Sequence, residues 1–260
     1  MKMTVRELFG ILNERIPRAL SCDWDNDGLM CCPDGEREVN RVLIALDATG
    51  AVCDAAIEGG YDLIVTHHPF IFKGLRAVED GNGLALKAMK LIKANISLMS
   101  FHTRLDCVAG GVNDALASAL GLERVETFEG DGSPMGRVGE LAEPMPLYSF
   151  AALVKEALGA PFVSFSDAGR EVKRVAVLGG SGKDFLGGAV AAGADTFVSG
   201  ELGHHTLTDE PDVIGGALNL VEAGHFYTEQ PVCRALAAMI AEIDGTIECD
   251  IMNSNPIKSV

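Results

Sequence analysis

The stretch that decides the fold is residues 42–68, VLIALDATGAVCDAAIEGGYDLIVTHH. An apolar run, a turn of small residues, a helix-like stretch that ends in glycine and a second apolar run follow one another. This order is typical of a β–α–β unit, in which a right-handed crossover joins two parallel strands. The unit ends in His67 and His68, although the whole chain contains only six histidines.

A second stretch repeats this pattern. Residues 175–201 read VAVLGGSGKDFLGGAVAAGADTFVSGE and align with the first stretch without a gap, at an offset of 133. Asp62 falls on Asp195, and the paired histidines fall on Gly200-Glu201. Because glycine, alanine and valine recur in every β–α–β unit, matches of these residues alone carry little weight.

A histidine followed by an acid four positions later comes after each unit. His102 and Asp106 follow the first unit, and His225 and Glu229 follow the second, at an offset of 123. The recurrence of this pair in the same order favours an internal duplication over two unrelated units. We therefore predict an α/β fold with two related lobes.

The composition is that of an ordinary globular chain, with 48% apolar and 22% charged residues. No long uncharged apolar stretch could span a bilayer, and residues 1–20 are too interrupted by charge to be a signal peptide. We therefore expect a cytoplasmic protein with no membrane partner. The seven cysteines contain no CxxC pair, which favours reduced thiols over a cysteine-rich zinc site.

The formal net charge is −16. Such a surface repels phosphate backbones and anionic lipids, so nonspecific nucleic-acid binding is not expected. A small anionic ligand held close to bound metal is still compatible with this charge, which leaves a small-molecule or nucleotide substrate open.

Candidate metal ligands fall at or just after predicted strand ends, where sites collect in parallel α/β sheets. They are His67, His68, His102, Asp106, His225 and Glu229. Imidazole and carboxylate groups together suit zinc, iron(II), manganese or cobalt. The supply exceeds one tetrahedral site with three protein ligands and suits two ions bridged by a carboxylate and a water. Spacing alone leaves open whether these side chains bind metal or serve as hydrogen-bonded structural groups.

Two further segments leave alternatives open. DWDNDGLM (residues 23–30) could supply ligands or bind a substrate amine, or it could form a turn whose Asp and Asn side chains cap backbone amides. LGGSGKDF (residues 178–185) is not a P-loop, because Val177 stands where glycine is required and Asp184 follows the lysine. A tight strand-to-helix turn is favoured there over a weak anion site.

Several motifs together resemble one known family. They are WDNDGL (24–29), THHP (66–69), HTRLD followed by GGVNDALA (102–117), SGE followed by HH (199–205) and GHFYTE (224–229). This set, in this order, resembles the Nif-three-like dinuclear metal-centre family, whose members are often called GTP cyclohydrolase I type 2 homologues. The resemblance covers nearly the whole chain.

The resemblance implies two divalent metal ions and five protein ligands: His67, His68, Asp106, His225 and Glu229. By analogy, His68 and Asp106 serve one ion and His67 and His225 serve the other. Glu229 bridges the two ions. The metal could be zinc, iron, manganese or cobalt, since the donors do not select among them.

The resemblance also implies how the chain is organised. Two intertwined α/β lobes are expected, with the metal site between them. The first would comprise residues 1–124 and 216–260, and the second residues 125–215. The family commonly assembles as a hexameric ring, so a homo-oligomer, most simply a homohexamer, is expected.

The function expected from these features is that of a metal-dependent hydrolase of the GTP cyclohydrolase type. A water between the two ions would act as nucleophile, and His102 would act catalytically by carrying the proton. The alternative is a non-enzymatic metal carrier, insertase or regulatory scaffold that uses the same metals to bind a partner.

Overall fold

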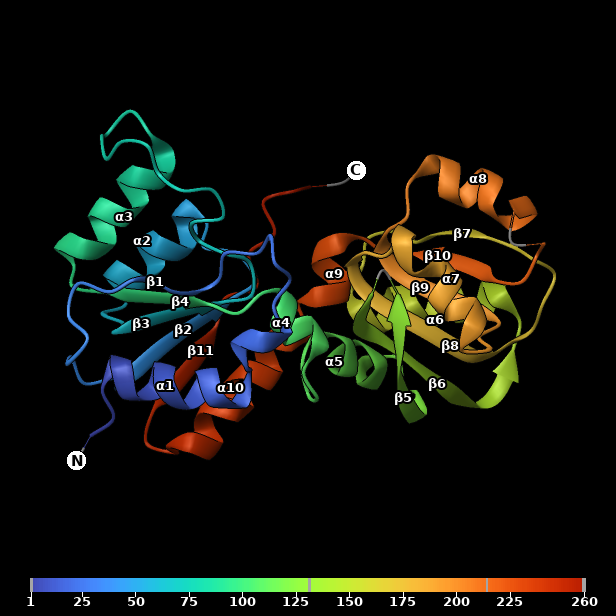
Figure 1. The fold of residues 1–260 in the computed structure, drawn as a ribbon, viewed down its shortest axis with the longest axis horizontal. Helices are drawn as coiled ribbons and strands as arrows, with labels where there is room; N and C mark the ends of the chain where they lie inside the picture. The colour runs from blue at the N-terminus through green and yellow to red at the C-terminus, as the bar shows by residue number, and fades with distance from the viewer. Residues whose placement is uncertain (1, 131, 214, 259–260) are drawn as a thin grey trace. The chain divides into compact units, whose positions relative to one another are not determined.

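A computed structural model describes residues 2–130, 132–213 and 215–258. The chain forms two compact units (Figure 1). The first is built from residues up to Val108 and from Cys233–Ile257, and the second from Ala109–Val232. The compact units divide the chain at 108/109 and 232/233. The lobe boundaries expected at 124/125 and 215/216 concern a different division and stay a prediction.

The first unit contains one mixed sheet with the strand order β1-β4-β3-β2-β11. Its strands are β1 (Gly28–Cys31), β2 (Arg41–Ala45), β3 (Leu63–Thr66), β4 (Ser97–Ser100) and β11 (Glu248–Ile251). β2, β3, β4 and β11 are parallel, and β1 pairs with β4 in the antiparallel direction. β3 and β4 are buried at every residue, as expected of central parallel strands.

Helices cover both faces of this sheet (Figure 1). The helices of this unit are α1 (Val5–Arg15), α2 (Gly50–Glu58), α3 (Gly83–Lys93), the short α4 (Thr103–Cys107) and α10 (Val232–Ile243). The 3₁₀ turn η1 (Arg18–Leu20) follows α1. α2 and α3 pack together on one face, where Val52 and Leu91 join Leu43, Ile64 and Leu98 in one apolar core. α1 and α10 lie on the opposite face.

The second unit contains a sheet with the strand order β5-β6-β8-β9-β10-β7. Its strands are β5 (Glu123–Gly130), β6 (Ser133–Met145), β7 (Ser164–Ser166), β8 (Val172–Ser181), β9 (Thr196–Glu201) and β10 (Asn219–Glu222). β8, β9 and β10 are parallel, and the remaining pairings are antiparallel.

The helices of the second unit are α5 (Val112–Ala119), α6 (Leu147–Leu158), α7 (Leu186–Ala191), α8 (His204–Val213) and α9 (His225–Glu229), with the 3₁₀ turn η2 (Lys183–Phe185) before α7. α5 and α6 pack on the sheet, where Leu116 and Phe150 meet Val177, Val198 and Val221. Residues 178–185 form the strand-to-helix turn favoured from the sequence, because β8 runs to Ser181 and η2 follows.

The two β–α–β units pair their strands in the same register. Val42 lies opposite Leu63 between β2 and β3, and Val175 lies opposite Thr196 between β8 and β9. Both partners are related by the offset of 133 that the sequence showed (175 − 42 and 196 − 63). The predicted α/β class is confirmed, and this shared register supports the proposed duplication.

One carboxylate in each unit makes the same hydrogen bonds. Asp62 accepts backbone N–H bonds from Asn40 (2.8 Å) and Arg41 (3.0 Å) at the start of β2. Asp195, its counterpart, accepts them from the residues that correspond by the same offset, Lys173 (3.0 Å) and Arg174 (2.7 Å). Each aspartate comes just before the second strand of its β–α–β unit. It therefore ties the start of that strand to the start of the first strand.

Among the described residues, no helix combines the length and the apolar character needed to cross a membrane.

Candidate metal centre

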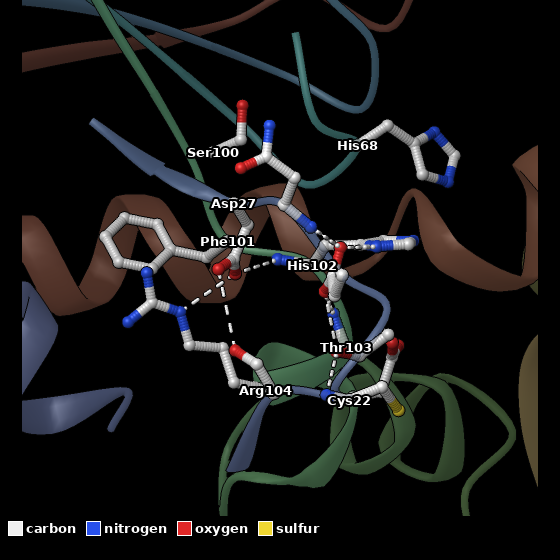
Figure 2. Close-up of polar contacts among 12 residues, drawn as sticks. Cys22, Asp27, His68, Ser100, Phe101, His102, Thr103 and Arg104 are labelled. Carbon is white, nitrogen blue, oxygen red and sulfur yellow. Dashed lines mark hydrogen bonds and ion pairs between the residues drawn. The ribbon is translucent and has the colours of Figure 1, made fainter. Parts of the chain in front are cut away.

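Three histidines lie together at the carboxyl edge of the first unit's sheet. His67 and His68 follow β3 directly, and His102 comes two residues after β4. One ligand atom of each lies within 4.8 Å of the others. His67 is fully buried, and the side chains of His68 and His102 extend to the same side of the chain (Figure 2). Three imidazoles this close are a donor set that suits a divalent metal ion.

Each of these imidazoles is held at its Nδ1 atom. His67 Nδ1 lies 2.9 Å from the Phe101 carbonyl oxygen, His68 Nδ1 lies 2.7 Å from Asp47 Oδ1, and His102 Nδ1 lies 2.9 Å from Asp25 Oδ1. Carbonyl and carboxylate oxygens only accept hydrogen bonds, so each Nδ1 donates. The lone pair of each neutral ring therefore lies on Nε2, the arrangement typical of metal-binding histidines.

Asp106 adds a carboxylate beside this cluster. It lies in α4, the short helix that follows His102. Asp106 Oδ1 is 3.8 Å from His67 Nε2, and its side chain is mostly buried. The first unit therefore gathers three of the five expected ligands, His67, His68 and Asp106, around the predicted proton carrier His102.

Two of the three aspartates of DWDNDGLM, Asp25 and Asp27, are buried and act as anchors. Asp25 Oδ2 accepts from the backbone N (3.1 Å) and the Oγ1 (2.6 Å) of Thr103. Asp27 Oδ2 accepts from the His102 N (2.9 Å) and from the Arg104 Nε (2.9 Å). Figure 2 shows Asp27 between the His102 backbone and the Arg104 guanidinium. The capping alternative for this segment is the one that the structure supports.

The hydrogen bonds also keep Asp25 ionised. Burial by itself favours the neutral carboxyl, but the bonds from His102 and Thr103 outweigh it and lower the pKa of Asp25 far below its usual range. An ionised Asp25 accepts the hydrogen bond of His102 Nδ1 and so fixes the direction of that ring.

The second unit carries the other two expected ligands on one short helix. His225 begins α9 and Glu229 ends it. His225 Nε2 lies 3.1 Å from Glu229 Oε2, and its Nδ1 lies 3.1 Å from Glu201 Oε1. Glu201 stands where the first unit has His68, at the end of the second parallel strand. His225 therefore has a carboxylate beside its Nδ1, as His68 and His102 have in the first unit.

Glycines let α9 approach the ends of its strands. Gly180 adopts a φ of +66°, and a Cβ there would collide with Glu229 Oε1 and lie 3.2 Å from His225 Nε2. At Gly200 a Cβ would lie 2.6 Å from Thr228 Oγ1. The glycine-rich turn thus makes room for the His225–Glu229 pair, a role that its sequence did not reveal.

The structure corrects one detail of the repeat. α4 begins at Thr103 and α9 at His225, and the strands before them, β4 and β10, begin at Ser97 and Asn219. Both differences equal 122, whereas the histidine–acid pairs match at 123. Backbone equivalence therefore places His225 against Thr103, so the two histidine–acid pairs occupy neighbouring rather than identical positions in their units.

Sequence reasoning missed the acceptors that orient the rings. Asp47 follows β2 and Glu201 ends β9, so both lie at carboxyl strand ends like the histidines. Their position in the chain was the available signal, since an acid at a strand end beside a candidate ligand is the usual partner of a metal-binding imidazole.

The comparison with known proteins identifies the family. The sequence profile of Duf34/NIF3 (NGG1p interacting factor 3) matches residues 3–258. The chain belongs to this family. A Clostridium perfringens relative named "GTP cyclohydrolase 1 type 2 homolog" is 34% identical over 254 residues, which cover 95% of each chain.

Solved structures of this family show the same fold. A Staphylococcus aureus hypothetical protein superposes with a TM-score of 0.89 at 29% identity, covering 100% of both chains. Reduced HcgD from Methanocaldococcus jannaschii superposes with a TM-score of 0.79 at 27% identity, covering 98% of this chain and 99% of the other. The predicted family resemblance is confirmed, and its members carry GTP cyclohydrolase-like names.

Proposed function

We propose that the chain is a dinuclear metal-dependent hydrolase. The observation that carries this proposal is the orientation of the imidazoles: His67, His68 and His102 all have Nδ1 held by an acceptor. Three neighbouring rings with their Nδ1 atoms engaged support a role in which the Nε2 atoms serve one functional site, as ligands or as a proton carrier.

Five residues would hold the ions. We assign His68 and Asp106 to one ion, His67 and His225 to the other, and Glu229 to both, as the family resemblance implies. When bound, divalent ions supply Lewis acidity and lower the pKa of water towards neutrality. The mixture of imidazole and carboxylate donors fits zinc, iron(II), manganese or cobalt.

His102 would move the proton of the hydrolytic step. Its Nδ1 is engaged by the ionised Asp25, and its backbone N is fixed by Asp27 at 2.9 Å. These two anchors leave Nε2 as the position that takes up and returns a proton. Asp25 would stabilise the imidazolium that forms when it does.

The name of the relatives supports one substrate class. Their shared name, "GTP cyclohydrolase 1 type 2 homolog", points to hydrolytic opening of a purine ring system. We therefore propose a nucleotide or a related heterocycle as the substrate.

Glu229→Gln is the most direct test. The variant keeps the size of the side chain and removes the charge that would bridge the ions, so metal content and turnover should fall together. Glu171→Gln removes an exposed charge from the same unit and should change neither. Metal content is measured by elemental analysis and turnover with GTP and small phosphoesters. Full turnover by a metal-free Glu229→Gln protein would sink the proposal.

The same screen separates the hydrolase from its alternative. A metal carrier, insertase or regulatory scaffold would bind ions that exchange readily and would turn over none of these compounds.

The expected homohexamer is a further proposal, and light scattering of the purified protein tests it.

A further inference from the structure

Two exposed aromatic side chains stand beside the histidine cluster of the first unit. Trp24 is 63% exposed and Phe72 is 44% exposed. Trp24 is the chain's single tryptophan. Isolated apolar side chains on a surface need no explanation, but these two rings contact each other and His102.

The segment that carries Trp24 is held firmly although the ring itself faces solvent. Next to Trp24, Asp25 is only 6% exposed and accepts two bonds from Thr103. Cys22 N donates to Thr103 Oγ1 at 2.9 Å. The Asn26 amide donates to the Ile71 carbonyl at 2.5 Å, which ties this segment to the residue before Phe72. Buried anchors thus hold both rings at the surface.

The planes of the three rings are steeply inclined to one another. The Trp24 centroid lies 6.2 Å from that of Phe72 and 6.1 Å from that of His102, with interplanar angles of 72° in both cases. The centroids of Phe72 and His102 are 6.3 Å apart at 86°. Because the rings meet edge to face rather than stacked, each contact covers a face of one ring only.

We propose that Trp24 and Phe72 form a stacking site for the planar heterocycle of the substrate, a nitrogen heterocycle of purine size. Aromatic side chains bind such rings through their π-faces. The site is continuous with His102, so a ring stacked there would present its edge to the histidine cluster. The chain's charge of −16 disfavours a nucleic-acid strand as the occupant, and the anchored rings suit a small rigid ligand.

The catalytic meaning of this site rests on the proposed hydrolase, whereas ring binding itself does not. Binding is expected in the metal-free protein as well, because neither Trp24 nor Phe72 is among the expected metal ligands. The single tryptophan makes this measurable, since all tryptophan emission of the chain comes from Trp24.

The test titrates chelator-treated and metal-loaded protein with inosine, with ribose as the non-planar control. Trp24 emission is excited at the red edge, where purines do not absorb. Inosine should change the emission saturably in both forms, and ribose should not. Phe72→Leu should raise the inosine Kd by about tenfold. Phe162→Leu, which truncates an exposed ring of the second unit (62% exposed), should leave the Kd unchanged.

Two results would overturn the stacking site. One is the absence of a saturable change, or an equal Kd in wild type and Phe72→Leu. The other is a loss of assembly mass in Phe72→Leu and Trp24→Leu, because the rings would then join copies of the chain. Inosine binding without any turnover would refute the hydrolase and leave the site standing. Turnover of GTP with KM unchanged in both variants would refute the site and leave the hydrolase standing.

Discussion

At the scale of single residues, each imidazole of the first unit's histidine cluster is oriented by a different hydrogen-bond acceptor at its Nδ1 atom. Phe101 offers a carbonyl to His67, Asp47 a carboxylate to His68 and Asp25 a carboxylate to His102. The sequence predicted the histidines because they follow apolar runs directly. It did not predict Asp47 as a partner, since the β2–β3 pairing that brings Asp47 and His68 together is a long-range feature of the sheet.

Removing Asp47 tests whether such acceptors matter for metal binding. Asp47→Ala should lower the metal affinity by about 10- to 100-fold, because His68 would lose the partner that sets its tautomer and direction. Competition with a chromogenic chelator measures the affinity. Asp54→Ala is the matched control, since Asp54 pairs with Lys90 on the surface. Equal losses in the two variants would contradict the role given to Asp47.

Asp62 links residue chemistry to stability and pH. Burial alone would raise its pKa, but backbone bonds from Asn40 and Arg41 and the Arg37 guanidinium outweigh it, so its pKa is lowered. A lowered folded-state pKa means stability that is present above the unfolded value, near 4, and is lost as the pH falls through the folded value.

Asp62→Asn should therefore destabilise the protein by about 1–3 kcal/mol at neutral pH. The difference from wild type should shrink as the pH falls below about 4, as judged by urea unfolding at a series of pH values. A destabilisation of constant size down to strongly acidic pH would show that the charge of Asp62 is not responsible.

At the scale of elements, the repeated β–α–β unit was legible because its signals are local. Apolar runs, small-residue turns and helix-ending glycines predict β2, α2 and β3, and again β8, α7 and β9. The sequence did not predict that the two histidine–acid pairs are shifted by one residue relative to their helices. Thr103 and His225 are equivalent only through the strand ladders before them, and a one-residue shift leaves the spacing within each pair unchanged.

Gly180 gives a prediction at this scale. Gly180→Ala would place a methyl group at a φ of +66° and against the His225–Glu229 pair. It should cost about 1–3 kcal/mol of stability and weaken metal binding by displacing α9. Thermal unfolding and metal titration measure the two effects.

Gly187→Ala is the control, because a Cβ there has no heavy atom within 4 Å and Gly187 lies inside α7. It should be neutral or stabilise by about 0.5–1 kcal/mol. Unchanged metal binding in Gly180→Ala would contradict the proposal that Gly180 makes room for the His225–Glu229 pair.

At the scale of the whole molecule, the sequence predicted the α/β class and the family. It predicted little of β5 and β6, the strands at one edge of the second unit's sheet. β5 and β6 come from residues rich in glycine and charge, and most of β5 is exposed. Such an edge strand lacks the clear apolar alternation on which strand prediction depends. The site residues were predictable because chemistry concentrates at the carboxyl ends of the parallel strands, and those strands carry the strongest apolar signals.

The central proposal is a dinuclear metal centre held by the five expected ligands. Elemental analysis of the protein, purified gently and without chelators, tests it most directly. We expect about two divalent ions per chain. We also expect a marked loss of metal in His68→Ala and in His225→Ala alike, because each removes a ligand of a different ion. One ion per chain would contradict a dinuclear centre, and a metal-free wild-type protein would contradict the ligand set itself.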